Sequence, residues 1–105
     1  MPTVLDRPEE LRYVLLDGDK EIGEESYVDY GDERVVFHTF VSEEYAGQGL
    51  ASVLVRTVLD DIVAHGMKVV PVCPYVKAWL PKHPEYDAHV VTPTAAHLRA
   101  IAERP

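Results

Sequence analysis

The stretch Val41–Ser52, VSEEYAGQGLAS, decides how this chain folds. Its Gly47-Gln48-Gly49 turn lies between an apolar run that ends at Val41 and an amphipathic run that begins near Ala51. This order predicts a strand, a glycine turn and a helix. The first N–H groups of a helix have no partner within it, and this end of the helix is electropositive. The sequence therefore predicts an anion-binding turn, suited to a phosphate, at Gly47–Gly49.

A helix and a strand are predicted after this turn. Gly66 is a natural helix stop, and Lys68–Cys73 reads as a short buried strand. Strand, helix and strand over this length form a crossover unit, so Lys68–Cys73 should run parallel to Val35–Val41. The helix is predicted from apolar residues at helical spacing, which are Ala51, Leu54, Val55, Val58, Leu59 and Ile62.

Pro71 is unusual in a buried strand because it has no N–H to give to a ladder. Two explanations are open. Pro71 could lie at the edge of the sheet, or the two parallel strands could separate at its level. A gap of the second kind could admit a ligand.

Before the turn, short connections link the segments Leu11–Leu16, Glu21–Tyr30 and Arg34–Val41. They predict a three-stranded antiparallel meander, with the polar middle strand more exposed. The third strand is apolar on both alternations, which predicts cover on both faces: Val35 and Phe37 on one, Val36 and Phe40 on the other. The first ten residues are expected to be loosely held or to form an edge.

The C-terminal part should contain more helix than strand. We expect a short helix at Pro74–Leu80, a short strand at Asp87–Val91, and a last helix that begins at Thr92-Pro93 and ends near Glu103. The whole chain then reads as one α+β domain over residues 1–105. Its core spans about 11–90 and its helical tail 91–105.

Composition narrows the classes of partner. The 105 residues carry a net charge of −8, which argues against a nucleic-acid backbone as the main partner. An acidic surface fits a cationic acceptor, but it also serves solubility alone. The single cysteine, Cys73, fits a reducing cytosol, and no apolar run approaches 18 residues. We expect a cytoplasmic protein with no membrane contact.

Four segments in this order carry a family resemblance: the strand end His38–Val41, then Ala46–Ala51, Val69–Tyr75, and His83–Tyr86, which reads His-Pro-Glu-Tyr. Together they resemble the small stand-alone YjdJ-type branch of the GNAT N-acetyltransferase superfamily, over roughly residues 11–90. The cofactor motif of that superfamily is Arg/Gln-x-x-Gly-x-Gly/Ala. Gly49 and Ala51 match its last two fixed positions, and Ala46 replaces the usual Arg or Gln.

The resemblance implies a compact GNAT-like fold with splayed parallel strands, and acetyl-CoA as co-substrate. The pantetheine arm would pair with the backbone near Thr39 and Val41. Full-length members carry helices where this chain has only the turn Asp17–Lys20, so the acceptor pocket should be shallow or completed by a partner chain, as in a homodimer. The pyrophosphate would be held by the backbone amides of Gly47, Gln48, Gly49, Leu50, Ala51 and Ser52.

Three side chains are candidates for the chemistry. His38, next to the pantetheine segment, suits a general base near neutral pH. Cys73, beside a helix start, could act as a nucleophile or proton donor, or be a small buried residue. The resemblance implies that Tyr75 protonates the departing thiolate. The histidines have no ligand spacing, so we expect no metal.

The leading hypothesis is an N-acetyltransferase that moves an acetyl group directly from acetyl-CoA to an amine of unknown identity. The alternative is a non-catalytic acyl-CoA-binding or sensing module, which the missing acceptor helices would suit. A dinucleotide-binding domain is disfavoured, because that fingerprint follows a parallel strand and needs an acidic residue about 20 positions later. This chain has His65–Val70 there.

Overall fold

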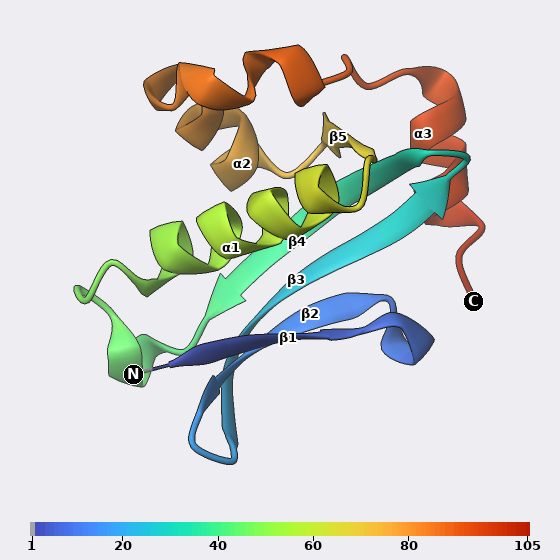
Figure 1. Cartoon of the computed structure of the whole chain (residues 1–105). Coiled ribbons are helices and arrows are strands. Elements are labelled where there is room, and N and C mark those ends of the chain that lie inside the picture. The colour runs from blue at the N-terminus through green and yellow to red at the C-terminus, as the bar shows by residue number, and fades with distance from the viewer. Residues whose placement is uncertain (1) are drawn as a thin grey trace.

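In the computed structural model, which describes residues 2–105, one five-stranded sheet follows the order of the chain (Figure 1). From the first strand to the fourth, each strand pairs antiparallel with the next, and the fifth pairs parallel with the fourth. This confirms the α+β fold with a meander followed by a crossover. The strands are β1 (Thr3–Arg7), β2 (Arg12–Asp17), β3 (Lys20–Tyr30), β4 (Glu33–Val41) and β5 (Lys68–Pro71). The α-helices are α1 (Leu50–Ala64), α2 (Pro74–Trp79) and α3 (Ala95–Ala102).

The meander has four strands, where the sequence predicted three. β1 forms the outer edge and pairs with β2 from Thr3↔Leu16 to Arg7↔Arg12. The expectation of an edge is therefore confirmed, and the sheet begins before the predicted core at residue 11. Nothing in five residues between two prolines signals a strand; pairing with β2 supplies the hydrogen bonds that stabilise it.

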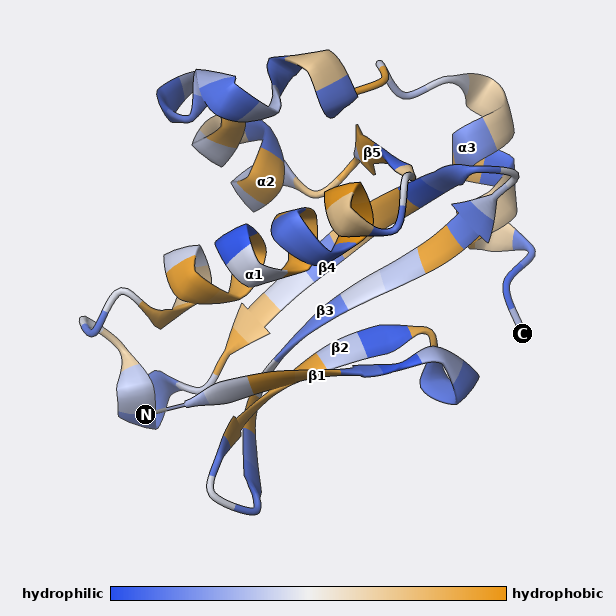
Figure 2. Ribbon diagram, in the orientation of Figure 1, coloured by the Kyte–Doolittle hydropathy of each residue, from blue (hydrophilic) through white to orange (hydrophobic). Residues whose placement is uncertain are grey.

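The main core lies between α1 and one face of the sheet. Every predicted core position of α1 except Ala51 is buried, and Leu50 joins them. Figure 2 shows the hydrophobic side of α1 turned toward the strands. Complete burial of one leucine or valine side chain stabilises a fold by about 1.5–3 kcal/mol. The sheet residues facing α1 include Tyr13, Leu15, Ile22, Tyr27 and Val36.

A bulge in β4 changes which side chains face α1. Ser26 pairs with His38 and Tyr27 with Val36, so Phe37 has no partner of its own in β3. An extra residue of this kind shifts the alternation by one position.

The predicted faces of β4 are confirmed up to the bulge, where Val35 and Phe37 share one face, and are wrong beyond it. Val36 packs in the core under α1, whereas Phe37 packs in a second cluster on the opposite face. Past the bulge, Thr39 faces the α1 side, where it contacts Cys73. Phe40, predicted to share a face with Val36, lies on the other face and is 50% exposed.

The second cluster is covered by α3, which packs on Val28, Val35 and Val70 through Ala100 and Ile101. The first half of β4 is thus covered by α1 on one face and by α3 on the other, as the sequence predicted.

The predicted start of α3 was two residues early. Thr94 caps it, because His97 accepts a hydrogen bond from the Thr94 N–H at 2.9 Å. The His97 Nε2 atom also lies 2.6 Å from Glu33 Oε1, and His97 is 3% exposed. This buried polar contact fixes the start of α3 on β4.

Pro71 satisfies both explanations offered for it. It lies in the edge strand β5, and alternation turns its nitrogen toward the outer edge, where the Val69 carbonyl accepts from Val91 N–H at 2.8 Å. The β4–β5 ladder also ends there: Val36↔Pro71 is its last pair. Within residues 2–105, no strand pairs with β4 on this side beyond Val36.

The predicted strand at Asp87–Val91 is wrong. Pro84–His89 forms a 3₁₀ helix, and only Val90 makes an isolated bridge, with Val69. Proline at its first position favours the helical turn. No helix within residues 2–105 is long and apolar enough to cross a membrane.

Candidate functional site

A cleft of about 400 Å³ lies at the N-terminus of α1, between the end of β4 and α2. Seven of the residues predicted for the site line this cleft. Gln48 and Thr39 are not among those that line it, although both are near it in the sequence. The lining residues are Val41, Tyr45, Ala46, Gly47, Gly49, Leu50, Ala51, Ser52 and Tyr75.

The two glycines shape this cleft through their backbone conformation. Gly47 has a φ of 81° and Gly49 a φ of 72°, in the left-handed region that other residues rarely adopt. Gly49 is also the N-cap of α1 and offers no side chain as a cap. The N–H groups of the first turn of α1 therefore face the cleft without a capping side chain, as an anion site requires.

A side-chain hydrogen bond joins the helix α2 to the first turn of α1. Trp79 Nε1–H donates to Ser52 Oγ at 2.8 Å, and Trp79 packs against Tyr86 at 5.6 Å between ring centroids. This contact places Tyr75, which is 40% exposed, on the wall of the cleft. Partial burial raises the pKa of Tyr75, so its phenol stays protonated near neutral pH.

Deeper in the fold, three side chains from three elements meet where β4 leaves β5. The Cys73 Sγ atom lies 3.1 Å from Thr39 Oγ1, and the Thr39 hydroxyl donates to Glu25 Oε1. Cys73 is 3% exposed and Glu25 is fully buried. Burial raises the pKa of Glu25 to about 8, against the lesser opposing effect of its hydrogen bonds.

Glu25 was missed by the sequence reasoning, which took β3 for the exposed strand of the meander. In fact β3 is the central strand, and Ile22, Gly23, Glu25, Tyr27 and Val28 are buried. Glu25 alternates with Gly23 and Tyr27 on the face toward α1. A carboxyl at an inward position of a strand was the signal that could have found it.

The structure does not bring His38 to the other two candidates. Since Thr39 faces Cys73, its neighbour His38 faces the opposite side of the sheet. There its side chain is 55% exposed, with Nε2 4.0 Å from a Glu24 carboxylate oxygen. His38 therefore remains a prediction without support from contacts to Cys73 or Tyr75.

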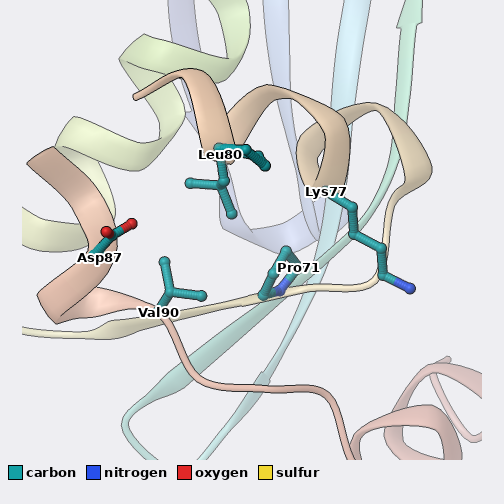
Figure 3. A pocket seen from close by; sticks show the side chains of 6 residues that line it. Pro71, Lys77, Leu80, Asp87 and Val90 are labelled. Carbon is teal, nitrogen blue, oxygen red and sulfur yellow. The ribbon is translucent and has the colours of Figure 1, made fainter. Parts of the chain in front are cut away.

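A second hollow, of about 350 Å³, lies on the outer edge of β5 (Figure 3). Leu80 and Val90 point toward Pro71 there, and the Lys77 ammonium points away from them. Lys82, by contrast, lines a small depression with Tyr75 and Trp79 next to the main cleft. Lys77 thus lies at the outer edge of β5, whereas Lys82 lies near the main cleft.

Comparison with known proteins agrees with this geometry. The solution structure of a GCN5-like protein from Staphylococcus aureus superposes with a TM-score of 0.66 at 23% identity, over 90% of this chain and 93% of that one. The ribosomal-protein-S18-alanine N-acetyltransferase from Escherichia coli gives a TM-score of 0.53 at 22% identity, over 61% of this chain and 42% of that one. At these identities the likeness shows the fold. None of the curated proteins compared with the chain matches it.

The family follows from the sequence itself. Residues 12–90 match the family model described as GCN5-related N-acetyl-transferase. This segment contains β2–β5, the glycine turn, α1 and α2, and with them every residue that lines the cleft. The chain belongs to the GCN5-related N-acetyltransferase family.

Proposed function

We propose that this protein transfers the acetyl group of acetyl-CoA directly to an amine. The observation that carries the proposal is the continuity of two surfaces. The cleft at the uncapped start of α1 reaches Val41, at the end of the β4 segment that β5 leaves unpaired. An elongated ligand with a phosphate end and an amide-bearing arm fits such a pair of surfaces.

The residues present fit CoA by their backbone more than by their side chains. The N–H groups of Gly47–Ser52 would bind the pyrophosphate, and the backbone of Thr39 and Val41 would pair with the pantetheine amides. No Lys or Arg is among the described residues that line the cleft. Lys82 is the nearest candidate for a ribose phosphate, since it shares the neighbouring depression with Tyr75.

The side chains would divide the chemistry. Acetyl-CoA supplies the acetyl group as an activated thioester. The Tyr75 phenol, on the cleft wall and protonated near neutral pH, would give its proton to the departing thiolate. Cys73 would lie beside the reacting carbonyl, at the end of the β4–β5 ladder. His38 would act from the opposite face, where an amine could approach.

The finer assignments belong to the same proposal. We place the protein in the YjdJ-type branch, with residues 1–105 acting as one acetyltransferase domain in the cytoplasm. The turn between β2 and β3 adds no wall to an acceptor site, so a second copy of the chain would complete it in a homodimer. The acceptor is an amine, for which the net charge of −8 favours a cationic form.

Binding and turnover can be tested separately. Acetyl-CoA at about 100 times its Kd should stabilise the protein by about 2.7 kcal/mol. For a domain of this size, each kcal/mol raises the melting temperature by roughly 4–8 °C. Release of CoA should then be measured with spermidine, a lysine peptide and free amino-terminal peptides as acceptors.

A rise in melting temperature together with CoA release above the rate without amine supports the proposal. Absence of a shift with millimolar acetyl-CoA contradicts it. A shift without release by any amine would identify a non-catalytic acyl-CoA-binding module instead.

A further inference from the structure

Glu25 is a buried carboxyl without an ionic partner. It is fully buried, and none of the salt bridges within residues 2–105 includes it. Its Oε2 atom is buried with no hydrogen-bond partner among the described residues. Such a group costs a fold several kcal/mol when ionised and still costs energy when neutral. A purely structural role would be filled better by an apolar side chain.

A chain of hydrogen bonds leads from this carboxyl toward the site. Thr39 has a single hydroxyl proton, which it donates to Glu25 Oε1. Thr39 Oγ1 then accepts from the Cys73 thiol, 3.1 Å away. Thr39 itself is partly exposed, whereas Glu25 and Cys73 are buried. Thr39 is therefore the member of this chain that reaches the surface, although it is not among the residues that line the cleft.

We infer that Glu25 accepts the proton of the acceptor amine through the Thr39 hydroxyl. The inference rests on the proposed acetyl transfer and deepens it, because it assigns a proton acceptor on the same face as Cys73. Glu25 does not touch the amine, so it is a positioning residue that acts through Thr39. His38, on the opposite face, is then not needed as the base.

The proton movement balances without a further reactant. An N–H bond of the acceptor ammonium breaks, and its electron pair stays on nitrogen, which becomes the nucleophile. The released proton bonds to Thr39 Oγ1, whose own proton passes to Glu25 Oε1. Glu25 changes from carboxylate to carboxylic acid and Thr39 is unchanged.

Burial prepares Glu25 for this task. It raises the pKa of the carboxyl to about 8, close to where a general base works best near neutral pH. The surroundings of Cys73 should change when Glu25 gains or loses its proton. When Glu25 is protonated, the Thr39 hydroxyl no longer has to donate to it and can turn toward the Cys73 sulfur. As the only cysteine in the chain, Cys73 gives one resonance to follow.

The first test needs no acceptor. Glutamate side chains and Cys73 are labelled with ¹³C, and their resonances are followed by NMR from pH 4 to pH 10 in the wild type, Glu25→Gln, Thr39→Val and Thr39→Ser. We expect Glu25 to titrate about pH 8 and Cys73 to shift in the same range. The Cys73 response should vanish in Glu25→Gln and Thr39→Val and persist in Thr39→Ser. Titration of Glu25 near 4.5, or a Cys73 response unchanged in Glu25→Gln, overturns the inference.

The second test uses turnover with the amines named above. Glu25→Gln should lower kcat about 10²–10⁴-fold and remove the rise of rate with pH about pH 8, with KM for acetyl-CoA unchanged. Glu9→Gln, the same change at an exposed site, should leave kcat and the rise of rate with pH unchanged. An unaltered pH profile in Glu25→Gln overturns the inference. If the wild type acetylates no amine, the proposed function fails, while the NMR titration still decides whether Glu25 exchanges protons through Thr39.

Discussion

Trp79 Nε1–H donates a hydrogen bond to Ser52 Oγ at 2.8 Å, and this contact joins α2 to the first turn of α1. Both elements border the cleft, α1 through its N–H groups and α2 through Tyr75. This hydrogen bond thus helps to hold the proposed anion site and the proposed acid in a fixed relation.

Trp79→Phe should weaken this junction and leave the fold intact. The aromatic ring still packs, but Ser52 loses its donor, which costs about 0.5–1.5 kcal/mol. Urea unfolding of Trp79→Phe, Ser52→Ala and the double variant forms a cycle, and the double variant should be less destabilised than the sum of the two single ones. Strict additivity would mean that the two side chains do not act together.

Gly49→Leu should remove the stabilisation by acetyl-CoA. Its left-handed φ of 72° makes any side chain costly by about 1–2 kcal/mol, and this side chain would also enter the cleft. Gly18→Leu is the matched control: its φ is 60° in the β2–β3 turn, and a Cβ there also meets nothing within 4 Å. Both variants should melt earlier than the wild type, but Gly18→Leu should keep the full shift in melting temperature with acetyl-CoA.

Leu54→Ala should destabilise the protein by about 2–5 kcal/mol, because Leu54 is 0% exposed in the core under α1. Val53→Ala is the neighbouring control, since Val53 is 46% exposed. Its effect should stay within about 0.5 kcal/mol. Chemical denaturation measures both, and similar losses in the two variants would contradict the described orientation of α1.

The buried carboxyl should make stability depend on pH. Because the pKa of Glu25 is raised from 4.5 to about 8 on folding, the folded state holds a proton that the unfolded state has lost. The stability due to this proton is complete below pH 4.5 and is lost as the pH rises toward 8.

The difference in free energy of unfolding between the wild type and Glu25→Gln isolates this effect. It should fall as the pH rises, by at most about 1.4 kcal/mol per pH unit, and level off above pH 8. The corresponding difference for Glu9→Gln should be flat over the same range. A flat difference for Glu25→Gln as well would show that its carboxyl does not stay protonated on folding.

Much of the fold could be predicted from local patterns. The spacing of Leu54, Val58 and Ile62 predicted α1, and Pro71 predicted an edge strand or a separation of strands, both of which the structure contains. β1 was expected only as an edge or a loosely held segment, and the Pro84–His89 helix was not predicted, because both depend on contacts with other segments: β1 pairs with β2, and the Tyr86 hydroxyl donates to Asp60 of α1.

Sequence by itself determined the glycine turn, the helix that follows it and the crossover, because these depend on backbone freedom at Gly47 and Gly49 and on a helical period of apolar residues. Only the tertiary structure decided which side chains meet. The bulge at Phe37 turned Thr39 toward Cys73 and His38 away, and pairing of β3 at the centre of the sheet buried Glu25. A shift of one residue in register reverses every face beyond it, and no local pattern records that shift.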